Sequence, residues 1–260
     1  MARRSREAGT IKLGILSAAL IAGSALPALA DDNKLTLTGS ASFTTDYIFR
    51  GLSDSARKPA VQPEFDLTYG IFYGYIWGSN DDLGQSGGQN ISGGIEIDYG
   101  VGITPMWKGI TFNIAGLYYT FPGALDLGGE ADFFELRTGA SYTFAKKLTL
   151  SVNNYWSPEF FGGTGNADAI EGSAAYAFDG KLFNFFSPSI SGGVGTWQFV
   201  NAAIPDYTYW NAGLTLGFLE HWSADVRYYD TDLNTTGCFT FIGAQNSCGA
   251  SVVGTIKATF

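Results

Sequence analysis

Hydrophobic and polar side chains alternate along the chain after residue 33. In the segment 34–50 the odd positions are mainly apolar, while the even positions carry mainly Ser and Thr. The segments 60–69, 90–101, 132–143 and 221–231 alternate in the same way. A period of two residues is typical of strands with one apolar and one polar face, so this pattern predicts β-strands.

Twelve segments of this kind can be delimited, although 109–121 and 187–200 are mixed, which leaves the facing of their side chains open. The predicted strands are 34–50, 60–69, 71–78, 90–101, 109–121, 132–143, 147–157, 168–178, 187–200, 207–217, 221–231 and 249–260. Connections after odd-numbered strands are long and rich in Gly, Asp, Asn and Pro, whereas most others are short, such as Ala145-Lys146. Long loops outside and short turns inside are typical of outer-membrane barrels, with both chain ends in the periplasm.

After the N-terminal segment no run of apolar residues is long enough for a membrane-spanning helix. Strands that cross a membrane must close into a barrel, because backbone polar groups cannot stay unpaired in lipid. We therefore predict an all-β fold, a transmembrane antiparallel up-and-down β-barrel of about 12 strands. The alternative is a soluble β-sandwich, which would place more Lys and Glu on its outer faces.

The 20 Phe, 14 Tyr and 6 Trp residues gather near the ends of the predicted strands. Aromatic rings are favoured where acyl chains meet headgroups, so we expect two girdles. The girdle expected toward the long loops holds Tyr47, Phe49, Trp77, Tyr118, Trp156, Trp197 and Trp210. The girdle expected toward the short turns holds Tyr69, Tyr99, Trp107, Phe218 and Trp222.

The N-terminus has the parts of a secretory signal peptide. Basic residues from Arg3 to Lys12 precede a short apolar run that ends in Ala28-Leu29-Ala30. This predicts a signal peptide at 1–30, cleavage after Ala30, and export through the general secretory pathway as a barrel of residues 31–260. A membrane anchor is the alternative, but a spanning helix needs about 20 apolar residues.

Charge excludes one class of partner. Removal of residues 1–30 takes four of the 15 basic and one of the 24 acidic residues, which leaves a formal net charge of -12. Nucleic-acid phosphates would repel such a chain, so nucleic acid is not an expected partner.

The polar face of the predicted strands places eight acids and four bases toward the lumen. These expected pore-lining residues are Asp46, Arg50, Glu64, Asp66, Glu96, Asp98, Glu135, Arg137, Glu171, Asp225, Arg227 and Lys257. An acidic excess lowers the energy of a cation in a confined passage, so a mild cation preference is our hypothesis. The alternative is that these charges pair across the lumen and fill it.

An enzymatic barrel is the main competing class, and the sequence does not favour it. The single His, His221, falls in a predicted short turn on the periplasmic side, away from external substrates. The pairs Glu64 with Asp66 and Glu96 with Asp98 share a strand face, which a charged lumen wall produces without catalysis. We expect neither catalytic residues nor a cofactor.

Two loop features remain. Cys238 and Cys248 flank a short stretch of the last long loop, and an oxidising compartment favours a disulfide there over a metal site. Asp81-Asp82 in another long loop is interpreted as solvated acidic sequence, with binding of divalent cations beside lipopolysaccharide as the alternative.

The mature sequence resembles the TorF-type porins of proteobacteria, a family formerly known as a conserved domain of unknown function. The resemblance is carried by FTTDYIFRG (43–51), PAVQPEFDL (59–67), FYGYIWGSN (72–80) and EIDYGVG (96–102). It implies an outer-membrane barrel that passes small solutes, and it assigns no functional residues. The cysteine pair is not part of this pattern.

The combined prediction is a passive or selective channel in the outer membrane of a Gram-negative bacterium. The alternative is a barrel with a closed lumen and an adhesive or structural role in the envelope. Expected partners are small solutes, outer-membrane lipid and lipopolysaccharide, for a chain that acts as a monomer. The final strand ends on Phe260, which resembles the signal read by the barrel-assembly machinery.

Overall fold

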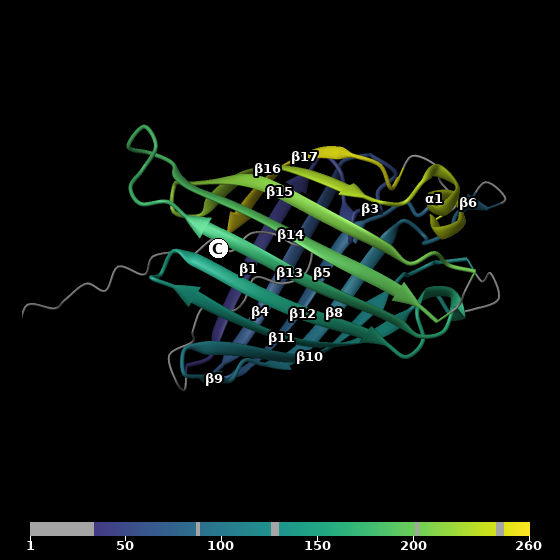
Figure 1. Ribbon diagram of the computed structural model, residues 1–260, viewed down its shortest axis with the longest axis horizontal. Coiled ribbons are helices and arrows are strands. Elements are labelled where there is room, and N and C mark those ends of the chain that lie inside the picture. The colour runs from purple at the N-terminus through teal and green to yellow at the C-terminus, as the bar shows by residue number, and fades with distance from the viewer. Residues whose placement is uncertain (1–33, 87–88, 126–129, 201–202, 243–246) are drawn as a thin grey trace, which may run out of the picture.

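The computed structural model describes residues 34–86, 89–125, 130–200, 203–242 and 247–260, which form one closed barrel (Figure 1). In these residues twelve long antiparallel strands pair in chain order, and β1 pairs with β17 to close the barrel. The strands are β1 (Thr36–Thr44), β4 (Ala60–Tyr69), β5 (Phe72–Asn80), β8 (Ile95–Ile103), β10 (Ile110–Thr120), β11 (Phe133–Phe144), β12 (Leu148–Ser157), β13 (Ala167–Ala177), β14 (Ser187–Phe199), β15 (Tyr207–Phe218), β16 (Trp222–Thr231) and β17 (Ser251–Thr259). The predicted all-β barrel is confirmed.

Short elements occupy the connections. Toward the long loops these are β2 (Ile48–Phe49), β3 (Leu52–Ser53), β6 (Gln85–Ser86), β7 (Gln89–Asn90), the 3₁₀ turn η1 (Phe161–Gly163) and α1 (Thr235–Ile242). At the other end β9 (Met106–Trp107) pairs with β10. No helix in the described ranges is long and apolar enough to cross a membrane. The predicted signal peptide and its cleavage site lie outside the described residues.

The two ends of the barrel differ, and we call them the long-loop end and the short-turn end. β1 begins and β17 ends at the short-turn end, where Ser40 pairs with Thr259. Ala145 and Lys146 there have φ of 47° and 59°, as the two central residues of a tight hairpin turn do. The α1 and β6 elements mark the long-loop end in Figure 1.

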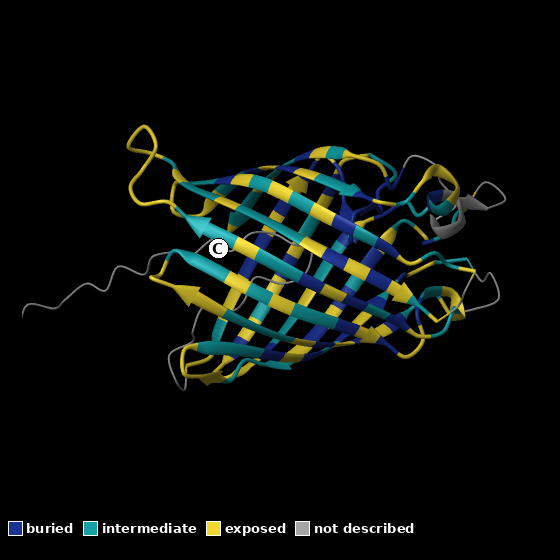
Figure 2. Ribbon diagram, in the orientation of Figure 1, coloured by how far each residue is buried: buried dark blue, intermediate teal, exposed yellow. Residues whose placement is uncertain are grey.

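The alternation places apolar side chains outside and polar side chains inside. Leu37 is 69% exposed and Phe65 is 53% exposed, whereas Ser42 and Thr44 are buried. Figure 2 shows the resulting alternation of exposed and buried positions along the strands. In the mixed segments, β10 points Tyr119 inward and β14 does the same with Trp197, so the large inward rings explain why neither pattern was clear.

Glycine on one strand makes room for a tyrosine of the next strand inside the barrel. A Cβ at Gly100 would lie 2.0 Å from the ring of Tyr75, and a Cβ at Gly195 would lie 2.5 Å from the ring of Tyr209. Neither site tolerates a side chain while the ring stays in place. The glycine content of the chain therefore serves the packing of aromatic rings against the inner wall.

Four aromatic residues expected in the long-loop girdle face the interior instead. Tyr47 lies 5.3 Å from Trp77 and Phe49 lies 5.7 Å from Trp197, measured between ring centres. The girdle prediction is wrong for these four because β1 ends at Thr44 and because Trp77 and Trp197 fall on the inward parity of their strands. Their rings pack together within the barrel.

Burial changes along the length of the interior. On β11 the inward Glu135 is 1% exposed, whereas Thr143, which has the same parity near the short-turn end, is exposed. The interior is therefore filled toward the long loops and accessible to solvent toward the short turns.

Candidate functional site: the lumen and its inner loop

Residues 45–59, which connect β1 to β4, fold into the barrel, and we call them the inner loop. Thr44 and Ala60 are paired directly across the two strands, so a two-residue turn would be enough to join them. The longer connection turns inward, and its Tyr47, Ile48 and Leu52 side chains are buried. Since a loop on the outer surface would expose such residues, the inner loop narrows the lumen.

The tip of the inner loop is a tight turn between β2 and β3. Arg50 and Gly51 have φ of 46° and 84°. A Cβ at Gly51 would lie 2.5 Å from Cγ2 of Thr231 and 2.8 Å from Cβ of Tyr209. Only glycine fits there, so the tip lies directly against β15 and β16.

Asp46 lies at the base of this loop and not in the barrel wall. The expectation of a first strand that reaches residue 50 is wrong, because the alternation continues into a segment that leaves the sheet. Ser53 and Ser55 donate hydrogen bonds to Oδ1 of Asp46 at 2.6 and 3.0 Å, and Arg57 lies 3.9 Å from Oδ2. Asp46 therefore joins the two halves of the inner loop.

Arg50 carries the charge at the tip, again away from the wall position expected for it. Its two terminal nitrogens donate to the two carboxylate oxygens of Glu135 on β11, both at 2.7 Å. Its guanidinium carbon lies 4.4 Å from the ring centre of Trp197 and 4.8 Å from that of Tyr155. The Tyr207 hydroxyl donates to the Arg50 carbonyl oxygen at 3.0 Å. A bidentate ion pair covered by rings thus fixes the tip to the far wall.

Four carboxylates gather in the lumen around β8, which is separated from the β11 strand of Glu135 by β10 alone, and we call them the acidic cluster. Glu96 and Asp98 project from β8, and Asp81 follows the end of β5. Asp54 comes from the inner loop, and none of the four is more than 9% exposed. The interpretation of Asp81 as solvated is therefore wrong, because the inner loop covers it.

The acidic cluster is electrostatically strained. Burial raises the pKa of Asp54 well above its ordinary range, and the neighbouring Glu96 and Asp81 raise it further. Burial also raises the pKa of Asp81, to about 6. Oε2 of Glu96 and Oδ1 of Asp98 are buried without a hydrogen-bond partner. In the described part of the chain no group of three or more His, Cys, Asp or Glu side chains could hold a metal ion.

Two further ion pairs connect residues that were predicted for the lumen. Lys257 of β17 lies 3.4 Å from Glu64 of β4, across the strand β1 that separates them. On β16 the Arg227 guanidinium lies 3.1 Å from the Asp225 carboxylate, with the Thr215 hydroxyl donating to Asp225 at 2.7 Å. Part of the lumen charge is therefore neutralised in place.

The remaining predicted lumen residues have other surroundings. Arg137 donates to Oδ1 of Asn153 at 3.2 Å, and Glu171 accepts a hydrogen bond from the Tyr209 hydroxyl at 2.7 Å. Asp66 is half-buried. Asp66, Glu171 and the two β8 carboxylates make no ion pair within the described ranges, so the carboxylates without an ion pair lie on β4, β8 and β13.

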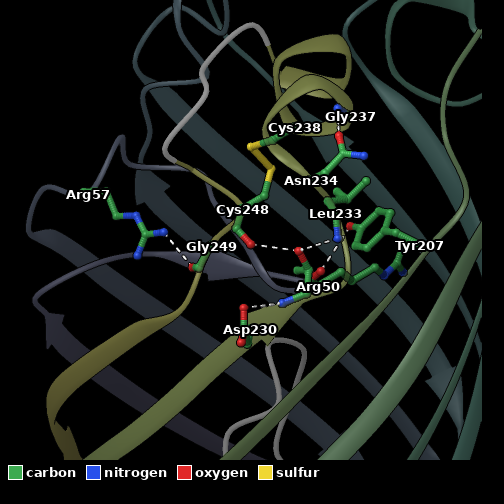
Figure 3. Close-up of a disulfide and its surroundings, with 11 residues drawn as sticks. Arg50, Arg57, Tyr207, Asp230, Leu233, Asn234, Gly237, Cys238, Cys248 and Gly249 are labelled. Atoms are coloured by element: carbon green, nitrogen blue, oxygen red, sulfur yellow. Dashed lines mark hydrogen bonds between the residues drawn. A yellow bond between two sulfur atoms is a disulfide. The ribbon is translucent and has the colours of Figure 1, made fainter.

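The last long loop supports the inner loop from the long-loop end (Figure 3). Cys238 and Cys248 form a disulfide there and both are buried. Beside it, the Ser53 amide donates to the Ser247 carbonyl oxygen at 2.8 Å, and Arg57 donates to the Gly249 carbonyl oxygen at 2.7 Å. The disulfide therefore closes the loop segment that holds the return half of the inner loop.

A small cavity borders the tip of the inner loop. Its lining includes Arg50 from the loop, with Glu171, Asn211 and Tyr229 from β13, β15 and β16. The tip is thus not packed on every side, and the space beside it belongs to the lumen.

Several functional candidates were missed in the sequence. Asp54 and Asp81 fell in connections that look solvated, Trp197 was placed in the aromatic girdle, and the facing of Tyr155 was not assigned. One signal was available, because the connection after β1 contains Tyr47-Ile48-Phe49 and Leu52, and a surface loop rarely carries such an apolar run.

A closed barrel of twelve long strands with an apolar exterior, a charged interior and a loop folded into its lumen defines the porin type of fold. The chain belongs to the Gcw_chp family, described as bacterial protein of unknown function, whose model matches residues 29–260. No curated protein matches the chain.

Two solved porins are similar in fold. A structure titled KdgM porin in complex with disordered oligogalacturonate has a TM-score of 0.55 and 5% identity, covering 86% of this chain and 99% of that chain. The NanC porin has a TM-score of 0.52 and 10% identity, with 86% and 99% of the two chains covered. Identities this low establish a shared fold.

Proposed function

We propose that this protein is an outer-membrane channel for small solutes, narrowed by its inner loop and selective for cations. The observation that carries the proposal is the closed barrel whose interior bears an excess of carboxylates. Asp54 and Asp81 add to the acidic excess predicted for the lumen. Uncompensated carboxylates in a confined passage favour cations.

The similar structures support the channel class and sharpen the selectivity. The KdgM structure is titled as a complex with an oligogalacturonate, which is an acidic sugar chain. The excess of acidic over basic residues predicted for the lumen of the present protein would disfavour such a ligand, so we propose cations and neutral solutes as its substrates. The resemblance to TorF-type porins supports the same class of function.

The proposal also includes the membrane around the channel and the route by which the chain reaches it. The apolar exterior suits outer-membrane lipid, and the long-loop end would face lipopolysaccharide and the medium. Export by the predicted signal peptide and assembly through the terminal Phe260 complete this scheme, with the chain acting as a monomer.

A second candidate, a closed barrel with an adhesive or structural role, is favoured by one observation. The Arg50–Glu135 pair and the disulfide-closed loop fill the lumen at the long-loop end. If this filling is permanent, the exposed loops and not the lumen would carry the function.

Single-channel conductance of the refolded protein in a planar bilayer, with the reversal potential measured in a salt gradient, separates the two. We expect ohmic steps with cation selectivity, and several-fold larger steps when an Asn-Gly turn replaces residues 45–59. Neutralising Asp66 and Asp98 together should shift the reversal potential toward zero selectivity. Insertion without conductance in both proteins would favour the closed barrel.

A matched control keeps the selectivity result specific. Asp179 is a carboxylate that pairs with Lys147 at the short-turn end. Asp179→Asn should leave the reversal potential unchanged. An equal shift in this variant would mean that net charge, and not the lumen wall, sets the selectivity.

A further inference from the structure

The site around Arg50 is built by the barrel wall and not by the loop that supplies the arginine. Glu135 belongs to β11, Tyr155 to β12 and Trp197 to β14. We call these three residues the cage. Because all three lie on strands, their backbone positions are set by the barrel and not by the inner loop. The Tyr119 hydroxyl also donates to Oε2 of Glu135 at 3.0 Å, which orients the carboxylate independently of Arg50.

The chemistry of the cage matches one class of cation. A carboxylate that offers both oxygens to two parallel N–H groups suits a guanidinium, which presents a planar fork of donors. Indole and phenol rings stabilise a cation over their faces, here at 4.4 and 4.8 Å. A primary ammonium would satisfy the charge but not the bidentate geometry.

The other lumen arginines lack this combination. Arg137 lies 5.5 Å from the Tyr155 ring centre, but its hydrogen bond goes to the Asn153 amide. Arg227 pairs with Asp225, two residues away on its own strand. Only at Arg50, among the arginines of the described lumen, do a carboxylate and two rings from the wall enclose a guanidinium supplied by a separate segment.

The structure also gives this site a neighbouring space. The small cavity beside the loop tip is lined by Arg50 and by Glu171, a second carboxylate. None of the three cage residues lines this cavity, so it adjoins the Arg50 side chain and not the cage itself.

We propose that the cage of Glu135, Tyr155 and Trp197 is a binding site for solutes that bear a guanidinium group, and that Arg50 occupies it as an internal ligand. This inference rests on the proposed channel function and names a substrate class for it. Such a solute competes with Arg50, so its binding is coupled to the release of the inner loop.

The test uses methylguanidinium as the probe and Arg50→Ala in the full-length barrel, purified in detergent. Calorimetric titration should show binding to Arg50→Ala at least about tenfold tighter than that of methylammonium, since a bidentate charged contact replaces a single one. Adding Glu135→Gln should weaken methylguanidinium binding by at least about tenfold. Equal binding of both cations, or no effect of Glu135→Gln, would overturn the proposal.

A matched control is Arg137→Ala, which removes another lumen arginine beside Tyr155 but leaves Arg50 in the cage. It should show no comparable methylguanidinium binding. If Arg50→Ala does not refold, Arg50→Gln tests the same vacancy with a neutral side chain of similar length. In the wild-type protein methylguanidinium should increase tryptic cleavage after Arg50 more than methylammonium does, and equal cleavage would count against the proposal.

Bilayer recording separates this inference from the proposed function. A variant Arg50→Ala that conducts potassium chloride and is blocked by methylguanidinium supports both. Conductance without block or calorimetric binding overturns the cage and leaves the channel. Binding without conductance overturns the channel and leaves the cage.

Discussion

The cage and the acidic cluster are two sites in one lumen that interact with the inner loop in opposite ways. At the cage, Arg50 meets an oriented carboxylate and two rings. At the acidic cluster, Asp54 meets Glu96 and Asp81, and burial and like charge both disfavour its ionised form. The loop is thus attracted at the cage and repelled at the acidic cluster, which is an arrangement suited to release.

The largest expected effect is on the release of the inner loop, and it should have opposite signs at the cage and at the acidic cluster. Glu135→Gln leaves the buried Arg50 without its charge partner, which costs about 3–5 kcal/mol when one member of a buried pair is removed. Glu96→Gln removes one of several like charges and should stabilise the closed loop. Tryptic cleavage after Arg50, which is buried in the closed loop, should rise in the first variant and fall in the second.

Thermal unfolding of both variants provides the control. The barrel strands are intact in each, so the melting temperature should change much less than the cleavage rate. Changes in the cleavage rate of the same sign in both variants would contradict the contrast between the cage and the acidic cluster.

The comparison of the cage with the acidic cluster also shows how much of the site could be predicted from the sequence. Most of the twelve strands follow from alternation, because each wall position faces either lipid or the lumen, although 109–121 and 187–200 are mixed. Glu135 and Glu96 were both placed inward by this rule. Their different roles could not be predicted, since alternation assigns a face and says nothing of what approaches that face.

The path of the inner loop could not be predicted from the sequence, although the site depends on it. Arg50 and Glu135 are 85 positions apart, and their contact depends on where β11 lies around the closed barrel. Local alternation through Tyr47 and Phe49 resembles one more stretch of strand. The end of β1 is set instead by the pairing of Thr44 with Ala60, which no local pattern reveals.

A smaller effect is expected from the disulfide. Closing a loop of this size contributes about 2–3 kcal/mol to the structure of the loop itself. Only part of this reaches the inner loop, through the Ser247 and Gly249 carbonyl oxygens, at about 1 kcal/mol for each hydrogen bond. Replacing Cys238 and Cys248 by Ser should raise tryptic cleavage after Arg50, but less than Glu135→Gln does.

Combining the replacement of both cysteines with Glu135→Gln shows whether the cage and the disulfide support the inner loop independently. The cage and the disulfide hold different parts of the inner loop, so their effects on cleavage should add in free energy. An effect of the Ser pair as large as that of Glu135→Gln would place the main support of the loop at its outer end and not at the cage.

The smallest effect is a dependence on pH that comes from the acidic cluster. The pKa of Asp81 is raised from 3.8 to about 6 in the closed loop, chiefly by burial. The pKa of Asp54 is also raised, chiefly by burial and then by Glu96, Asp81 and Asp46, while Arg50 lowers it. The closed loop therefore binds more protons than the released loop, and its stability falls as pH rises from about 4 through about 6 and above.

Cleavage after Arg50 and channel conductance should both increase over this range. We expect a change of about 1 kcal/mol, because Asp81 stays beside Asp82 when the loop leaves and keeps part of its shift. Asp54→Asn with Asp81→Asn should flatten the response, whereas Asp179→Asn, which removes the partner of Lys147 at the short-turn end, should preserve it. A loop that is released as pH falls would mean that protonation acts on Glu135 and the cage before it acts on the acidic cluster.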